Sequence, residues 1–299
     1  MNFTSINDVS RDQIHNIFDI TDKIRRGEEE ITLKENMTLA LFFEKPSTRT
    51  RLSFEVAMAR LGGRCIYIDS KTSQVSRGEP LSDTARIMSL YVDFIAARMY
   101  KHSDLVQIAE NSTSPVINAL TDLEHPTQAL ADLYTMSTKK KLKGLRIAFV
   151  GDTAQNTANS LMLAATKMGA EMALIGPEGY PPRAEYLTRA REYGVVDLYD
   201  SMVEGLANAD VIYTDTFVSM GNEKDADKRR KMFAKYQVNS KALQCAKKDA
   251  MVMHPLPAFR GEEITADVLE GPQSLIWEQS KNKMLTAQAL IMFLSEKIV

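Results

Sequence analysis

The chain contains 299 residues, of which 44% are hydrophobic and 25% are charged, and its formal net charge at pH 7 is −2. This composition is that of an ordinary folded protein, and the length favours two domains over one. The near-neutral charge argues against nucleic acid as a partner, and the apolar runs are shorter than the ~20 residues that a membrane span needs.

The first part of the chain alternates apolar runs with helical patterns. Buried strands are predicted at 37–43, 64–69, 92–100 and 114–120. Helical spacing appears in "RLSFEVAMARLGG", where Gly62 is a suitable stop, and in "LSDTARIMSLY". A further helix is predicted from about His125.

A short charged stretch, "KKKLKG" at 139–144, indicates a joint between two domains, after which the alternation restarts. Strands are predicted at 145–152, 171–177, 209–215 and 249–257, with helices from about 156, over 183–193, over about 225–236 and over 284–297. We therefore predict an α/β fold of two doubly wound parallel-sheet domains. The expected domains are residues 1–140 and 145–283, with the C-terminal helix, 284–299, packing back on the first domain.

Polar side chains follow most of the predicted strands. In open parallel sheets, ligands bind outside the carboxyl ends of the strands, so these side chains are candidates for a site. Each of them alone is equally well explained as a cap, a turn or a salt bridge. The residues concerned are Ser47–Thr50, Arg98, Asn118, His125, Asp152, Asp215 and His254.

The stretch 43–55, "FEKPSTRTRLSFE", places hydroxyl side chains and an arginine at the start of a predicted helix. A helix start offers unpaired N–H groups and a partial positive charge, which suit a phosphate. The competing interpretation is a plain helix cap with solvent-facing arginines. Downstream, "HPTQ" sets His125 and Gln128 on one face of a first helical turn, and "HPLP" at 254–257 braces a second histidine with prolines.

The cysteine and histidine content gives little support to a metal site. Cys65 and Cys245 are isolated, without the spacing of a zinc site or an evident disulfide framework, and the four histidines form no pair at metal-ligand spacing. The beginning of the chain, "MNFTSINDVSRDQ", has no secretory pattern. We expect a cytoplasmic protein with reduced thiols that binds neither membrane nor nucleic acid.

Six ordered motifs resemble the aspartate/ornithine carbamoyltransferase family. They are "STRTRLSFE", "GEPLSDTAR", "ARMY", "HPTQALAD", "DTFVSMG" and "HPLPAFRGEE", and the resemblance runs from about residue 3 to the C-terminus. Within the family, "VSMG" and "FRGEE" are similar to the ornithine branch. The resemblance implies transfer of a carbamoyl group from carbamoyl phosphate to the side-chain amine of ornithine, with the two substrates meeting between the domains and without a metal or organic cofactor.

The resemblance also implies which residues act. Catalysis falls to Arg49, Arg98 and His125. Carbamoyl phosphate is expected to contact Ser47, Thr48, Arg49, Thr50, Gln74, Arg98, His125, Gln128, Pro255, Leu256 and Lys283. Ornithine is expected to contact Asn156, Asp215, Ser219 and Met220. Gln74 matches a residue that reaches into a neighbouring subunit, so the resemblance implies a homotrimer or a multiple of trimers.

Two positions differ from the ornithine branch, and the acceptor stays open between ornithine and aspartate or another amine. Pro255 stands where that branch has cysteine, as in the aspartate branch, and Lys283 stands where it has arginine. Asp215 favours a cationic acceptor. The run of cations at 224–231 would suit the carboxylates of aspartate, although such a run is usually a solvated face.

Two other classes of function were weighed. A nucleotide-dependent oxidoreductase is suggested by "IAFVGDTAQN", a strand, a glycine and a helix, but only Gly151 is present where the dinucleotide fingerprint has three glycines. A catalytically inert regulatory subunit is disfavoured because Ser47–Arg49, Arg98 and His125 all remain.

Overall fold

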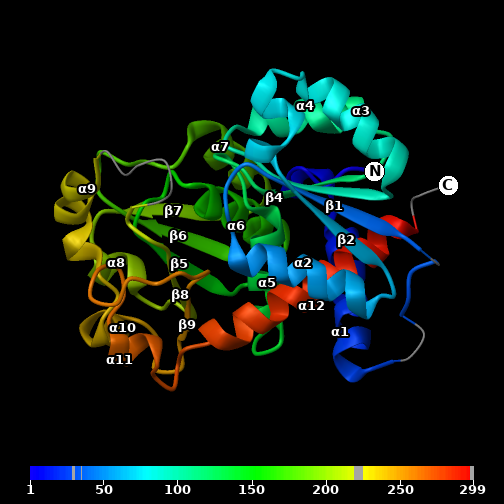
Figure 1. The fold of residues 1–299 in the computed structure, drawn as a ribbon. Helices are drawn as coiled ribbons and strands as arrows, with labels where there is room; N and C mark the ends of the chain where they lie inside the picture. Colours follow the sequence, from blue (N-terminus) through cyan, green and yellow to red (C-terminus); the bar gives the residue numbers. More distant parts are fainter. Residues whose placement is uncertain (29–30, 35, 219–224, 297–299) are drawn as a thin grey trace. The chain divides into compact units, whose positions relative to one another are not determined.

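The chain divides into two compact units, each built around a parallel sheet. The computed structural model describes residues 1–299 apart from 29–30, 35, 219–224 and 297–299. Unit 1 comprises Met1–Ala131 and Asn282–Val299, and unit 2 comprises Asp132–Lys281. Figure 1 shows strands with helices packed along them in both units, which confirms the predicted α/β class.

The sheet of unit 1 has the strand order β2-β1-β3-β4, with every neighbouring pair parallel. Its strands are β1 (Thr38–Phe43), β2 (Arg64–Asp69), β3 (Phe94–Arg98) and β4 (Val116–Leu120). Strands β1 and β3 lie in the middle and are buried along their whole length, which explains their continuous apolar sequences. Strand β2 forms an edge and is partly exposed along its length. All four strands were predicted.

Helices precede, connect and follow the strands of unit 1. They are α1 (Arg11–Arg26), α2 (Thr48–Arg60), α3 (Leu81–Tyr91), α4 (His102–Asn111) and α5 (Pro126–Ser137). Short 3-10 turns lie at Ile6–Asp8, Ser70–Thr72 and Gln74–Arg77. Helices α2, α3 and α5 confirm the sequence patterns, whereas α1 and α4 were not predicted. Helix α5 continues from unit 1 into unit 2.

The sheet of unit 2 has the strand order β7-β6-β5-β8-β9, again parallel throughout. Its strands are β5 (Arg146–Val150), β6 (Glu171–Ile175), β7 (Val196–Tyr199), β8 (Val211–Thr214) and β9 (Met251–Met253). Strand β7 was not predicted. It is a short edge strand in which exposed and buried residues mix, so it lacks the apolar run that marks the others.

The helices of unit 2 follow its strands. They are α6 (Asn156–Lys167), α7 (Ala184–Tyr193), α8 (Met202–Leu206), α9 (Ala226–Phe233), α10 (Ser240–Cys245) and α11 (Ala266–Leu269). Helix α9 passes into a 3-10 turn at Ala234–Tyr236, so together they fill the helix predicted over 225–236.

Helix α12 (Ile276–Ser295) closes the chain and runs from unit 2 into unit 1. We predicted a start at 284, but the helix begins at Ile276 because no glycine or proline interrupts the segment up to Ser295. Its C-terminal part belongs to unit 1, where Arg60 Nη1 of α2 lies 3.7 Å from Met284 Sδ. This bears out the prediction that the last helix packs back on the first part of the chain.

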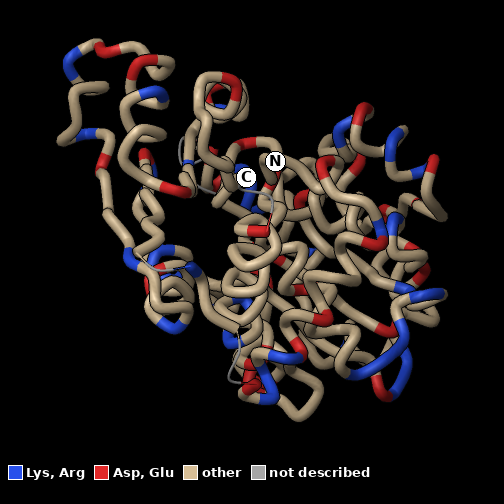
Figure 2. The backbone as a smooth tube through the Cα atoms, turned by 90° about the vertical axis from the view of Figure 1, so that its right-hand side faces the viewer, with Lys and Arg blue, Asp and Glu red and all other residues tan. Residues whose placement is uncertain are grey.

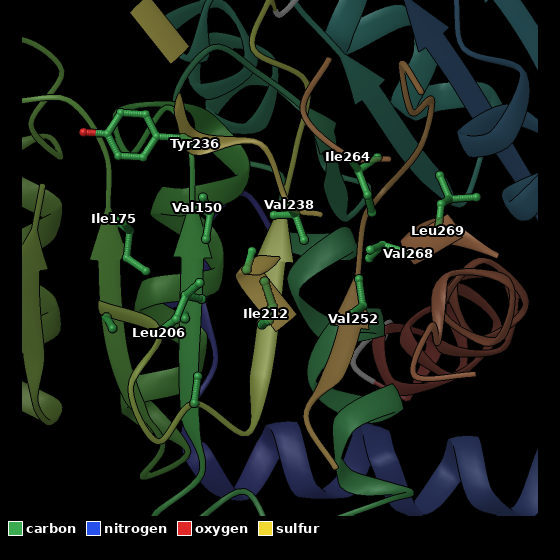
Figure 3. Close-up of a cluster of buried hydrophobic side chains, with 14 of the residues drawn as sticks. Val150, Ile175, Leu206, Ile212, Tyr236, Val238, Val252, Ile264, Val268 and Leu269 are labelled. Carbon is green, nitrogen blue, oxygen red and sulfur yellow. The ribbon is translucent and has the colours of Figure 1, made fainter. Parts of the chain in front are cut away.

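The core of unit 2 lies where strands and the later helices meet. In Figure 3, Val150, Ile175, Ile212 and Val252 lie on neighbouring strands of the sheet. Their side chains belong to one cluster with side chains from the helices and loops of unit 2, such as Leu206 and Val268. All are fully buried or nearly so, as are Phe217 and Phe233 of the same cluster. Burial of such side chains stabilises the fold by roughly 1.5–3 kcal/mol each.

Lysine and arginine residues are interspersed with aspartate and glutamate residues along the chain, as Figure 2 shows. Within the part of the chain that the structure describes, no helix is long and apolar enough to cross a membrane.

Each sheet has one point where the chain winding reverses. In unit 1 it lies between β1 and β3, because β1 leads to β2 on one side and β3 leads to β4 on the other. In unit 2 it lies between β5 and β8, which lead to β6 and β9 on opposite sides. Ligands bind at the carboxyl ends of the strands at such points. The topology therefore directs attention to the residues after these four strands.

Candidate active site

The start of α2 lies directly beyond the carboxyl end of β1. Ser47 is the N-cap residue, and its hydroxyl oxygen accepts a 3.3 Å hydrogen bond from the backbone N–H of Thr50. Thr48 and Arg49 are exposed, whereas Thr50 is buried. The capping interpretation is thus correct for Ser47, and the exposed Arg49 lies at the positive end of the helix, where an anion would be attracted.

Arg98 is the last residue of β3 and is buried. Burial and, to a smaller extent, the nearby positive charge of Arg49 together lower the pKa of its guanidinium to about 10. Its Nε atom has no hydrogen-bond partner among the described residues. A buried guanidinium with an unused donor, held near a second one, is an arrangement that a bound anion would stabilise.

Three predicted residues of unit 1 meet through one ammonium group. Lys283 Nζ on α12 donates a 2.8 Å hydrogen bond to Gln128 Oε1 and lies 3.4 Å from His125 Nε2. His125 and Gln128 flank the beginning of α5, and all three side chains are buried. Lys283, which stands where the ornithine branch has arginine, therefore contacts the first and the last residue of the "HPTQ" motif.

His125 is neutral at physiological pH. Burial lowers its pKa well below the usual 6.5, and the positive charges of Lys283 and Arg98 lower it further. A lysine ammonium can only donate, so His125 Nε2 accepts from Lys283 and the ring proton lies on Nδ1, which is 3.4 Å from Thr127 Oγ1. Neutral His125 thus adds no positive charge to those of Lys283 and Arg98 beside it.

Asp215 follows β8 at the reversal point of unit 2 and is partly buried. Burial raises the pKa of its carboxyl group, and the charge of Glu263 adds to this, while hydrogen bonds and His254 act in the opposite direction. The backbone N–H of Thr216 donates to Asp215 Oδ1 at 2.7 Å. Asn156, another predicted ornithine contact, is the first residue of α6, which begins after β5, the neighbour of β8 in the sheet.

The turn after β9 carries Pro255 and Leu256, both half-buried. Leu256 has φ of 55°, a left-handed conformation that costs a residue with a side chain about 1–2 kcal/mol. Its backbone N–H donates a 2.9 Å hydrogen bond to His254 Nδ1, which helps to hold this conformation. Two backbone carbonyls, those of Pro255 and Leu256, are thereby fixed in a turn that local preference alone would not favour.

His254 is held from behind by a buried carboxylate. Because Nδ1 accepts from Leu256, the ring proton lies on Nε2, which is 3.0 Å from Glu263 Oε1. Both side chains have no exposed surface, and Glu263 Oε1 also accepts from Phe259 N–H at 2.7 Å. His254 is therefore an orienting residue of the turn.

A second layer of buried polar groups supports the same turn. Gln279 Oε1 accepts from His254 N–H at 3.0 Å, and Gln279 Nε2 donates to Asp132 Oδ1 at 2.7 Å. The hydroxyl group of Tyr213 donates a 2.8 Å hydrogen bond to Asp132 Oδ2. Burial raises the pKa of this phenol well above 10, and the negative charge of Asp132 raises it further. We missed these residues because no local pattern marks Glu263, Gln279 or Asp132 as partners.

Three predicted contacts remain outside these clusters. Gln74 is exposed on a 3-10 turn of unit 1. Ser219 and Met220 lie outside the described residues. Among the described residues, no group of three or more histidine, cysteine, aspartate or glutamate side chains is arranged to hold a metal ion.

Comparison with known families matches both halves of the chain. Residues 1–138 match the carbamoyl-P binding domain of aspartate/ornithine carbamoyltransferase. Residues 143–294 match the Asp/Orn binding domain of the same family. The two models together cover the chain almost end to end, so the resemblance is not confined to a shared fold.

Curated relatives and solved structures agree with this match. The anabolic ornithine carbamoyltransferase of Pyrococcus furiosus is 47% identical over 265 residues, which are 87% of this chain and 84% of the relative. That of Ignicoccus hospitalis is 46% identical over 297 residues, 96% of each chain. The solved ornithine carbamoyltransferase of P. furiosus superposes with a TM-score of 0.94 at 43% identity, covering 100% of this chain and 98% of that one. The anabolic enzyme of Campylobacter jejuni gives 0.93 at 36% identity, covering 99% of both.

Proposed function

The chain belongs to the aspartate/ornithine carbamoyltransferase family, and we propose that it carbamoylates the side-chain amine of ornithine, producing citrulline and phosphate. The relatives named above are ornithine carbamoyltransferases at up to 47% identity. This membership removes the oxidoreductase interpretation. It also favours an active enzyme over an inert subunit, since the arginines and histidine expected to act are present.

The position of the Asp215 carboxylate is the observation that supports ornithine as the acceptor. A carboxylate at the carboxyl end of β8, within the Asp/Orn binding domain, attracts the ammonium or amine of an ornithine side chain. Aspartate would instead bring a second carboxylate beside it, and like charges in a poorly solvated site cost several kcal/mol.

The cations of the run at 224–231 support the same choice. Arg229 is buried and paired with Asp152, and Arg230 pairs with Glu262, with 3.1 Å between Nε and Oε2. Lys228 and Lys231 are exposed on α9. Of the described cations in this run, the arginines are thus engaged by acids of the protein itself, and the lysines are solvated, which is the ordinary state of such a run.

In the proposed reaction, carbamoyl phosphate binds unit 1. The start of α2, with Ser47, Thr48, Arg49 and Thr50, holds the phosphate. Arg98 polarises the carbamoyl oxygen with His125 beside it, and preorganised donors of this kind are typically worth about 3–4 kcal/mol each in the transition state. Within unit 1, Gln128 and Lys283 complete the carbamoyl contacts.

The chemical step is an acyl transfer. The neutral amine nitrogen of ornithine attacks the carbamoyl carbon, the bond from that carbon to the phosphate oxygen breaks, and the amine gives up a proton. An alkyl amine has a pKa of about 10.4 in water, so its deprotonation contributes to the barrier and the rate should rise with pH. Arg49 and the helix start stabilise the departing phosphate.

We also propose that the enzyme works in the synthetic direction and in the cytoplasm. Two of the relatives are described as anabolic. The two cysteines are free thiols, which suit a reducing compartment.

The decisive experiment supplies the purified enzyme with carbamoyl phosphate and, separately, with ornithine, aspartate and a panel of other amines. We expect citrulline as the main product, identified by mass spectrometry, with a rate that increases between pH 7 and pH 9, a range below the amine pKa of about 10.4. Carbamoyl aspartate formed readily without citrulline would show that Pro255 was the better guide to the acceptor.

For the assembly, we propose a homotrimer in which Gln74 contributes to the site of a neighbouring copy. Several large apolar side chains of unit 1 are exposed, which favours coverage by a second copy of the chain. They include Leu52 and Val56 on α2, Ile66 on the edge strand β2, and Leu90 and Tyr91 on α3. Gln74 itself is exposed on its own chain, as a residue that serves a neighbour would be.

Mixing two inactive variants tests the shared site. Gln74→Ala and Arg49→Ala chains, unfolded and refolded together, should regain part of the activity, because some sites in mixed trimers then draw both intact residues from different chains. Each variant refolded alone is the control. Sedimentation showing a fully active monomer would contradict the proposal.

A further inference from the structure

A buried arginine of unit 2 lies outside the residues discussed as substrate contacts. Arg229 is on α9 and is 6% exposed, although its neighbours Lys228 and Arg230 on the same helix are exposed. Taking a guanidinium out of water is costly unless its donors are satisfied. The groups that accept its hydrogen bonds therefore indicate the role of this buried arginine.

Arg229 uses two nitrogens to hold two different segments. Nε donates a 2.7 Å hydrogen bond to the backbone carbonyl of Phe217, and Nη2 forms a short ion pair with Asp152 Oδ2. Asp152 is fixed in turn, because its Oδ1 accepts from Ala154 N–H at 3.0 Å. The planar fork of an arginine carries these two donors on different nitrogens in a fixed geometry.

Aromatic rings enclose the guanidinium. Its Cζ lies 5.0 Å from the ring centroid of Tyr180 and 5.2 Å from that of Phe233. Phe233 stacks on Phe217 with 5.3 Å between centroids, and these two phenylalanines belong to the core cluster drawn in part in Figure 3. The side chain of Arg229 is thus anchored in the rigid core of unit 2, and movement of its head group is restricted.

The two segments that Arg229 holds are those that bear the predicted acceptor contacts. Phe217 lies two positions after Asp215, and Asp152 begins the turn that leads to Asn156 at the start of α6. They follow β8 and β5, which are neighbours in the sheet with Thr214 opposite Val150. A single guanidinium therefore ties together the two strand ends at the reversal point of unit 2.

We propose that Arg229, through its ion pair with Asp152 and its hydrogen bond to Phe217, is a positioning residue that sets the spacing of Asp215 and Asn156 for the acceptor amino acid. This inference rests on the proposed function, since it concerns the amino-acid site. Arg229 binds no substrate itself. Its loss should weaken acceptor binding selectively and leave carbamoyl phosphate binding to unit 1 unchanged.

The test compares Arg229→Gln with Arg230→Gln, its exposed neighbour on the same helix. The measured quantities are the KM for ornithine, kcat, and the Kd for carbamoyl phosphate from calorimetry without ornithine. We expect Arg229→Gln to raise the KM for ornithine by about tenfold or more, as befits loss of charged hydrogen bonds. The KM of Arg230→Gln for ornithine should stay within about twofold of wild type. The Kd for carbamoyl phosphate should also stay within about twofold of wild type in both variants.

Two further variants keep the test decisive if Arg229→Gln folds poorly. Asp152→Asn retains an acceptor but loses the ion pair, and Arg229→Lys retains the charge but cannot reach both acceptors. Each should raise the KM for ornithine by an intermediate factor. A folded Arg229 variant with an unchanged KM for ornithine would overturn the proposal, and so would equal losses in ornithine and carbamoyl phosphate binding.

Failure of the proposed acceptor gives a different result. If the wild-type enzyme carbamoylates another amine, the citrulline assay shows this before any variant is examined. The same comparison of Arg229→Gln with Arg230→Gln, made with that amine, then still decides whether Arg229 positions the acceptor site.

Discussion

Arg49→Ala is expected to weaken carbamoyl phosphate binding by about 10- to 100-fold while the fold remains intact, because a charge-assisted hydrogen bond contributes roughly 1.5–3 kcal/mol. Arg49 is exposed at the start of α2, so its removal leaves no cavity. Its charge lies close enough to lower the pKa of Arg98, after the larger effect of burial, so we expect both groups to act on the same anion.

Calorimetry with carbamoyl phosphate measures this loss. The matched control is Arg60→Ala, an exposed arginine in the last turn of the same helix, which should bind carbamoyl phosphate within about twofold of wild type. Near-normal affinity in a folded Arg49→Ala protein would remove the start of α2 from the phosphate site.

Asp215→Asn is expected to reduce kcat/KM for ornithine by about 100-fold or more and to leave the Kd for carbamoyl phosphate almost unchanged. Removing one partner of a buried, hydrogen-bonded charge pair costs about 2–5 kcal/mol. The amide keeps the shape of the side chain and can still accept from Thr216 N–H. Asp197→Asn, a change to a surface carboxylate on β7 of the same unit, is the control and should stay near wild type.

The pH profile distinguishes a charge effect from a change in shape. Burial raises the pKa of Asp215, so this carboxyl becomes protonated, and loses its attraction for a cationic side chain, at a higher pH than an exposed aspartate would. In wild type, kcat/KM for ornithine should therefore fall as the pH drops through that raised pKa. This additional fall should be absent in Asp215→Asn, where only the decline caused by protonation of the ornithine amine remains. An Asp215→Asn enzyme that keeps the additional fall would assign it to another group.

The fold was predictable where an element is fully buried, because its sequence is then continuously apolar. Strands β1 and β3 are buried along their length and appear as unbroken apolar runs. The edge strand β7 was missed because it is short and mixes exposed with buried residues, so it has no apolar run. Helix α1 was overlooked although its buried residues, Ile14, Ile17, Phe18 and Thr21, follow the spacing of an amphipathic helix.

The site was predictable only in part, for a related reason. Strand ends and a helix start could be located from the sequence, and the roles of their residues came from resemblance to a family. Contacts between distant positions could not, such as Lys283 with Gln128 and Arg229 with Asp152, which are 155 and 77 positions apart. No local pattern encodes such pairs, because the topology of the sheet brings them together.

Unit 1 is built from both ends of the chain, whereas unit 2 is continuous, and this order matters during synthesis on the ribosome. Lys283 and the buried Leu290 and Leu294 of α12 reach unit 1 only after all of unit 2 has been translated, a delay of about 8–30 s at roughly 5–20 residues per second. The nascent first segment must therefore wait with part of its apolar surface uncovered. Unit 2, although second in the sequence, can therefore complete its fold before unit 1 does.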